Sequence, residues 1–179
     1  MVKAILGVLA FLVVTTSADA QRYHRRLPRE SETATPPASI DKRDSLVTAG
    51  AFKGRAYWLA LAQCGGIYFK LNTLYTDAAV HARVVTPDPH ANADYTRKLN
   101  EAISVATAYF DAATRFLMTD RAIERDNAIL TYDGQSRAAG ERLKTIDEAL
   151  SAAKSCPVLY RGCEQAYPKA CSAPLAPMS

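Results

Sequence analysis

The sequence predicts an all-α fold: an antiparallel three-helix bundle followed by a short disulfide-bonded C-terminal tail. Apolar residues recur at alternating steps of four and three along extended segments, which is the spacing of one helix face. No βαβ alternation and no period-two strand pattern is present. The connections between the predicted helices are short, so consecutive helices should be antiparallel neighbours.

The first helix is expected within residues 46–84. Its inward-facing stripe consists of Tyr57, Leu61, Cys64, Tyr68, Leu71, Tyr75, Ala78 and Ala82. Gly65 and Gly66 interrupt this stripe, and a glycine inside a helix costs about 1 kcal/mol relative to alanine. Either another segment packs closely over the two glycines or the helix bends there.

Residues 86–89 separate the first helix from the second. Asp88 is a suitable N-cap, and Pro89 fits the first helical position. The second helix carries apolar residues at Leu99, Ile103, Ala106, Phe110, Ala113 and Leu117, and the pattern continues through Ile123 and Leu130.

Two interpretations are open for the end of the second helix. In the first, Asp133 and Gly134 end it, and Ser136 caps a third helix that ends at Cys156 and Pro157. The apolar positions of that third helix are Ala139, Leu143, Ile146, Leu150 and Ala153. In the second, the chain breaks near Thr119 and Asp120, and the last helix runs through Gly134.

The N-terminus predicts export. Residues 1–20 have the pattern of a signal peptide: Lys3, an apolar run, and small residues at Ala18 and Ala20, so cleavage is expected before Gln21. We expect a disordered basic and polar linker at residues 21–44, the helical domain at 45–172 and a disordered tail at 173–179. The expected location is the periplasm or the extracellular space.

Charge limits the classes of partner. The formal net charge is +4 with both signs interspersed, which is unlike a dedicated nucleic-acid binder. The linker begins with Arg22, Arg25 and Arg26, which could contact anionic lipid head groups at a membrane surface. The other interpretation is a solvated tail.

Four cysteines in an exported protein predict disulfides. Three pairings exist. Helical rise places Cys64 and Cys156 at similar heights in the bundle, which favours Cys64–Cys156 and leaves Cys163–Cys171 to close a small loop. No metal or haem motif with regular Cys and His spacing is present.

One group of residues could bind a metal. Asp77 and His81 lie four apart before the first turn, and His90 and Asp94 lie four apart after it. Because each pair shares a helix face, imidazole and carboxylate ligands could converge on a divalent cation. The alternative is helix capping and local ion pairing.

No catalytic motif is recognisable, and no cofactor is expected. The serines lack a nucleophile-elbow setting, and no glycine-rich phosphate loop occurs. Six tyrosines could line an aromatic groove or bury their rings in the core: Tyr57, Tyr68, Tyr75, Tyr95, Tyr109 and Tyr132. We expect a non-enzymatic binding or structural protein of the cell envelope with an unknown protein or envelope partner. The alternative is a periplasmic divalent-metal-binding protein.

Overall fold

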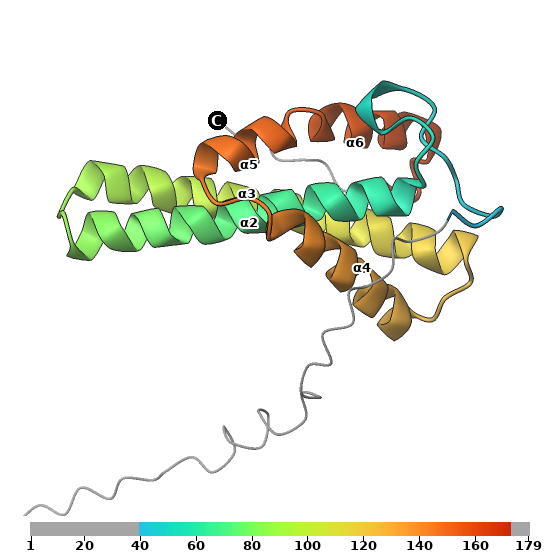
Figure 1. The fold of residues 1–179 in the computed structure, drawn as a ribbon, viewed down its shortest axis with the longest axis horizontal. Coiled ribbons are helices and arrows are strands. Elements are labelled where there is room, and N and C mark those ends of the chain that lie inside the picture. The colour runs from blue at the N-terminus through green and yellow to red at the C-terminus, as the bar shows by residue number, and fades with distance from the viewer. Residues whose placement is uncertain (1–39, 173–179) are drawn as a thin grey trace, which may run out of the picture. The chain divides into compact units, whose positions relative to one another are not determined.

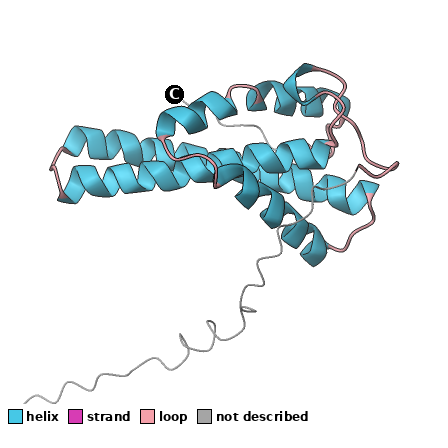
Figure 2. Ribbon diagram, in the orientation of Figure 1, coloured by secondary structure: helices cyan, strands magenta, loops and turns pink. Residues whose placement is uncertain are grey.

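The computed structural model describes residues 40–172. These residues form η2 (Gly50–Phe52), α2 (Tyr57–Val84), α3 (Pro89–Asp120), α4 (Arg125–Gly140), α5 (Ile146–Ala153) and α6 (Cys156–Ala166), as Figure 2 shows. Within them no strand forms, and Leu46 and Ala56 make only an isolated antiparallel bridge. The predicted helical, disulfide-bonded fold is confirmed. The signal peptide, most of the linker and the C-terminal tail lie outside the described residues.

The predicted first turn and the helices on either side of it are confirmed. α2 and α3 lie side by side as a long antiparallel pair (Figure 1). The Asp88 carboxylate accepts hydrogen bonds from the backbone N–H groups of His90 and Ala91, both at 3.0 Å. Every residue of the predicted α2 stripe is buried except Ala78, which is half-buried. None of the helices within residues 40–172 has the length and apolarity needed to cross a membrane.

The predicted three-helix bundle is not confirmed, because three shorter helices replace the third one. α3 ends at Asp120, so the interpretation with a break near Thr119 and Asp120 places this end correctly. Gly134 and Ser136 lie inside α4, and the Ser136 hydroxyl donates to the backbone carbonyl of Asp133 at 3.1 Å instead of capping a helix. Leu130 and Leu150, both predicted to face the core, are 69% and 40% exposed.

A capping box marks the start of α5, and a first-turn proline marks the start of α6. Thr145 and Glu148 form a capping box that starts α5 after α4 has ended at Gly140. Pro157 does not end a helix as predicted. It lies in the first turn of α6, where the missing N–H would have no helical partner.

The range of 46–84 predicted for the first helix is too long, because residues 46–56 do not belong to α2 and contain only the short 3-10 helix η2. The Val47 N–H donates to the Arg55 carbonyl at 2.9 Å, and the Gly54 N–H donates to the Val47 carbonyl at 2.8 Å, so the chain folds back on itself. Gly54, with φ of 79°, supplies the left-handed backbone this reversal needs.

A buried ion pair attaches this segment to the end of α3. Asp44 falls within the predicted linker, yet its side chain is fully buried. Its carboxylate receives two hydrogen bonds from the Arg121 guanidinium, from Nε at 2.8 Å and from a terminal nitrogen at 2.6 Å. The same guanidinium lies over the Trp58 ring, 4.7 Å from its centroid. The charge of Arg121 is therefore held between a carboxylate and an aromatic face.

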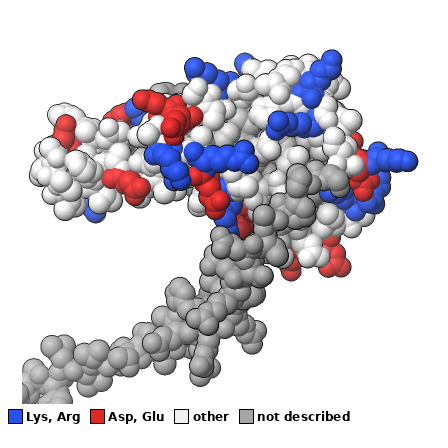
Figure 3. All heavy atoms as spheres, viewed as in Figure 1, with Lys and Arg blue, Asp and Glu red and all other residues white. Residues whose placement is uncertain are grey.

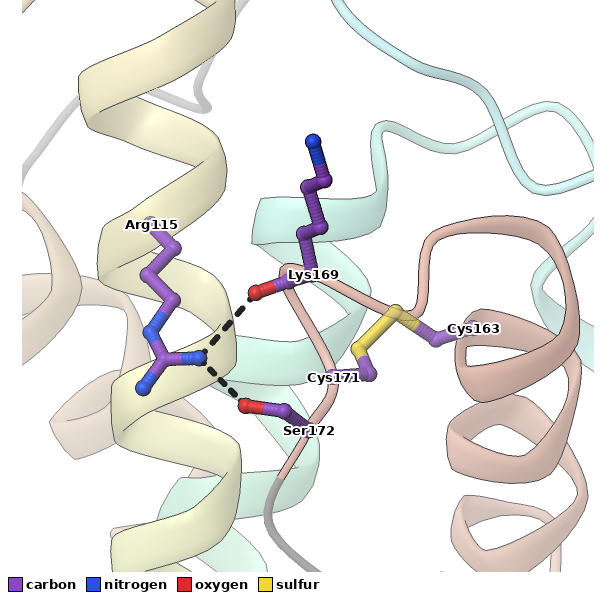
Figure 4. Close-up of a disulfide and its surroundings, with 5 residues drawn as sticks. All are labelled: Arg115, Cys163, Lys169, Cys171 and Ser172. Atoms are coloured by element: carbon purple, nitrogen blue, oxygen red, sulfur yellow. Dashed lines mark hydrogen bonds between the residues drawn. A yellow bond between two sulfur atoms is a disulfide. The ribbon is translucent and has the colours of Figure 1, made fainter.

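The two disulfides join the pairs that helix geometry predicted. Cys64–Cys156 links α2 to the first residue of α6 across 92 positions, with 5.7 Å between the Cα atoms. Cys163–Cys171 closes a short loop across 8 positions. Beside this loop, the Arg115 guanidinium donates to the Lys169 carbonyl at 3.1 Å and to the Ser172 hydroxyl at 2.8 Å (Figure 4). These bonds attach the loop to α3.

We predict that Asp44→Asn destabilises the protein in a pH-dependent manner. Burial alone would raise the pKa of Asp44, but hydrogen bonds from Arg121 and the Asp41 backbone outweigh it, so this pKa is lowered. The pair therefore stabilises the fold above about pH 4, and its contribution is lost as the pH falls through the folded-state pKa. Urea unfolding at pH 7 should show a loss of about 2 kcal/mol.

At pH 3 the same comparison should give a smaller difference from the wild type. The control is Asp126→Asn, because Asp126 is exposed on the first turn of α4, and it should change stability by about 0.5 kcal/mol or less. An equal loss for Asp44→Asn at both pH values would contradict the ion-pair explanation.

We predict that the two disulfides stabilise the protein unequally. Closing a loop of 92 positions should contribute about 4–5 kcal/mol in the chain-entropy model, and closing one of 8 positions about 2–3 kcal/mol. The paired variants Cys64→Ala/Cys156→Ala and Cys163→Ala/Cys171→Ala should follow this order in chemical denaturation. A larger loss of stability in Cys163→Ala/Cys171→Ala would show that the short bridge stabilises the protein by more than its loop-closure entropy predicts.

Candidate functional site

The best candidate site is a groove of about 610 Å³ between α2, α3 and α4. Its wall is apolar and comes from all three helices: Phe69, Ile103, Ala106, Phe110 and Ile129. Its polar and charged lining residues include Lys70, Thr73, Thr107, Asp133, Ser136, Arg137 and Glu141. We refer to this site as the α2–α4 groove.

Small residues bring α4 close enough to form this groove. A Cβ atom on Gly66 would lie 2.6 Å from the backbone carbonyl carbon of Ser136, and one on Gly65 would overlap the Tyr132 hydroxyl. Across the same contact, a Cβ on Gly140 would lie 3.0 Å from the Gly66 carbonyl oxygen. Of the two explanations for the paired glycines, close packing of another segment is therefore correct.

Aromatic side chains fix one wall of the groove. Phe110 of α3 and Tyr132 of α4 pack edge to face with ring centroids 5.0 Å apart, a favourable geometry for aromatic pairs. Tyr132 is almost fully buried, and this burial, with a smaller contribution from Asp133, raises its pKa. Tyr132 therefore stays neutral at physiological pH and acts as a packing residue.

Most polar groups of the groove already have partners. Asp133 and Arg137, one helical turn apart on α4, form an exposed salt bridge at 2.7 Å. The hydroxyls of Thr73 and Thr107 donate to carbonyls of their own helices, at 3.2 and 2.9 Å. Lys70 is half-buried in the groove and forms no ion pair with another described residue. The groove thus offers mainly apolar surface to a ligand.

Two apolar side chains of the groove are unusually exposed. Phe69 is 59% exposed and Ile103 is 37% exposed. The sequence pattern assigned Ile103 to the core-facing stripe of its helix, and that assignment is wrong. One sequence feature could have indicated the groove. Phe69 is an apolar residue outside the main α2 stripe, so it widens the apolar face of this helix beyond the part that packs on α3.

The predicted tyrosines mostly bury their rings in the core instead of lining a groove. Tyr68 stacks on Tyr109 with centroids 5.5 Å apart, and Tyr109 contacts Tyr160 edge to face at 5.1 Å. Burial raises the pKa of Tyr109, whose hydroxyl has no hydrogen-bond partner among the described residues. Of the six tyrosines named from the sequence, Tyr132 alone lines the α2–α4 groove.

The four predicted metal ligands lie near the α2–α3 turn, but they do not form a site. Asp77 and His81 lie in the C-terminal part of α2, and His90 and Asp94 lie at the start of α3. Within residues 40–172, no group of three or more His, Cys, Asp or Glu side chains is arranged to hold a metal ion.

Asp94 instead has local partners. It pairs with Lys98 at 2.8 Å and with Arg97 at 2.7 Å. Hydrogen bonds from Lys98 and Arg97 lower its pKa. These contacts match the alternative of local ion pairing, and the metal hypothesis rests on the sequence spacing alone.

Comparison with models of known protein families, with curated proteins and with solved structures finds no match to the chain. We therefore infer the function from the geometry of the described residues.

We predict that Gly66→Ala destabilises the α2–α4 contact. Alanine favours the helical backbone by about 1 kcal/mol. However, the added Cβ would meet the Ser136 backbone, which cannot move as a flexible side chain would. Overpacking of this kind costs about 1–3 kcal/mol, so chemical denaturation should show a net loss of stability.

Gly162→Ala in α6 is the matched control. A Cβ at Gly162 would meet only the Tyr57 hydroxyl, at 3.8 Å, which is an ordinary contact. This variant should be more stable than the wild type by about 0.5–1 kcal/mol. A stabilised Gly66→Ala would show that α4 does not lie directly on Gly66.

Proposed function

We propose that this protein is an exported, non-enzymatic binding protein whose α2–α4 groove takes a small molecule with an apolar body. The observation that carries the proposal is the exposed apolar wall of the groove, above all Phe69 and Ile103. Exposing such side chains in water is unfavourable, and a bound apolar ligand would bury them.

The size of the groove supports a small-molecule ligand. Its volume of about 610 Å³ lies within the range of small-molecule sites, roughly 300–1,000 Å³. Such sites combine apolar walls with a few polar groups that orient the ligand. In this groove Lys70 is the cation available for that role, since Arg137 is paired with Asp133.

We propose binding in preference to catalysis because most polar groups of the groove, other than Lys70 and Glu141, serve structural contacts. The Thr73 and Thr107 hydroxyls are bonded to their helices, and the Asp133 carboxylate is bonded to Arg137. The Ser136 hydroxyl is likewise bonded to the Asp133 carbonyl, so no serine or threonine hydroxyl of the groove is free to act as a nucleophile.

The two disulfides indicate an oxidising environment outside the cytoplasm. We propose the periplasm or the extracellular space as the location, with residues 1–20 removed as a signal peptide. We further propose that the segment with Arg22, Arg25 and Arg26 makes weak contact with anionic membrane surfaces.

N-terminal sequencing of the exported protein should give Gln21 as the first residue. An intact Met1 would contradict the export proposal.

The test of the groove is a substitution that fills it. Thr107 is exposed and lines the groove, so Thr107→Trp should occupy the space of the ligand without disturbing the core. We expect binding of the uncharged apolar dye N-phenylnaphthylamine, followed by fluorescence titration, to weaken by about tenfold or more, or about 1.4 kcal/mol.

Thr96→Trp provides the matched control. Thr96 is also an exposed α3 residue, and its hydroxyl donates to the carbonyl four positions earlier at 2.7 Å, as that of Thr107 does at 2.9 Å. Thr96 does not line the groove. The control should bind the dye like the wild type. Equal binding by both tryptophan variants would reject the groove as the ligand site.

A further inference from the structure

A second pocket, of about 770 Å³, lies between residues 47–52 and α6. It shares no lining residue with the α2–α4 groove. The folded-back segment that contains η2 forms one side, and the α6 residues Val158, Leu159 and Arg161 contribute to the other. We refer to it as the α6 pocket.

The charges that line the α6 pocket have one sign. Lys154 and Arg161 line it, and no Asp or Glu is among its lining residues. Neither cation forms a salt bridge with another residue of the described chain. Figure 3 shows Lys and Arg side chains over the part of the molecule that contains α6, with Asp and Glu side chains gathered near α5. The nearest acidic residue along α6, Glu164, lies outside the lining.

Apolar surface lies beside these cations in the same pocket. Val158 and Arg161 lie three positions apart on α6, so they share one side of that helix. Lys154 precedes α6 and lines the same pocket. Val158 is 57% exposed, and Phe52 from η2 is half-buried against the core. Two cations without a salt-bridge partner in the described chain, next to the exposed Val158 and the half-buried Phe52, match a molecule with an anionic group and an apolar part.

We propose that the α6 pocket binds a small amphipathic organic anion. Lys154 and Arg161 hold the anionic group, and Val158 and Phe52 contact the apolar part. Arginine and lysine both bind carboxylate, sulfate and phosphate groups through charge-assisted hydrogen bonds. Burial of the apolar part adds the hydrophobic contribution that a bare inorganic anion lacks.

The test is an NMR titration of the full mature protein with octanoate as the probe. Chemical-shift changes should concentrate in residues 47–52 and 154–166. Lys154→Gln/Arg161→Gln should weaken octanoate binding about tenfold or more, which is about 1.4 kcal/mol. Lys154→Arg/Arg161→Lys keeps both charges and should retain binding within about threefold, or roughly 0.7 kcal/mol.

Arg142→Gln/Lys169→Gln is the control, because it removes two exposed cations that do not line the pocket. It should bind octanoate like the wild type, and an equal loss in the control would overturn the proposal in favour of general charge attraction. Octanol, which lacks the negative charge, should bind more weakly than octanoate. Equal binding would contradict the proposal that Lys154 and Arg161 hold an anionic group.

A titration with inorganic phosphate tests whether the pocket prefers an amphipathic anion to a bare one. It should bind more weakly than octanoate, and equal or tighter binding would overturn the role of Val158 and Phe52. Thr107→Trp should leave octanoate binding unchanged, because Thr107 belongs to the α2–α4 groove. A loss of octanoate binding in Thr107→Trp would assign the anion to the groove and reject the α6 pocket.

Discussion

The close approach of α4 to α2 is the constraint on which the groove depends. α2 contacts every other α-helix of the described chain, and Gly65 and Gly66 provide the surface without side chains that α4 needs. The two glycines reduce the intrinsic helix propensity of α2. In exchange, the backbone of α4 reaches the backbone of α2 at Ser136 and Gly140, and the space beside this crossing becomes the α2–α4 groove.

Local signals in the sequence were sufficient for the antiparallel pairing of α2 and α3 and for the pairing of the cysteines, but not for the start of α2 or, in the first interpretation, the end of α3. The apolar stripe with steps of four and three, together with the Asp88 cap, predicted the antiparallel pair. The rise of a helix then placed Cys64 and Cys156 at the same height. The two helices and their turn depend on contacts within one helix or across one turn, where helical periodicity and capping act directly. The Cys64–Cys156 pairing spans 92 positions, and the height of Cys156 was estimated along a single third helix that the structure replaces with α4, α5 and α6.

The C-terminal half was harder to predict because equivalent signals competed there. Gly134 looked like a stop signal but lies within α4, where tertiary packing outweighs its low propensity. Thr145 and Glu148 have the spacing of a capping box, and this signal, visible in the sequence, was missed. The groove could not be predicted, since it depends on the angle at which α4 crosses α2, and no periodic pattern specifies that angle.

The ion pair of Asp44 and Arg121 also shows why the start of the folded region was placed too late. The residues around Asp44 are polar and resemble a linker in composition. Their order comes from contacts with the end of α3. The Asp44 carboxylate receives two hydrogen bonds from Arg121, and the Ser45 N–H donates to the Asp120 carboxylate at 2.7 Å. Contacts between segments about 75 positions apart leave no trace in local composition.

The unequal spans of the two disulfides have a consequence for oxidative folding. Loop-closure entropy favours contact between Cys163 and Cys171, which are 8 positions apart, over contact across the 92 positions between Cys64 and Cys156. Once the short bridge has formed, only one partner remains for each of the other two cysteines. We therefore expect the short bridge to form first and to leave Cys64–Cys156 as the one remaining pairing.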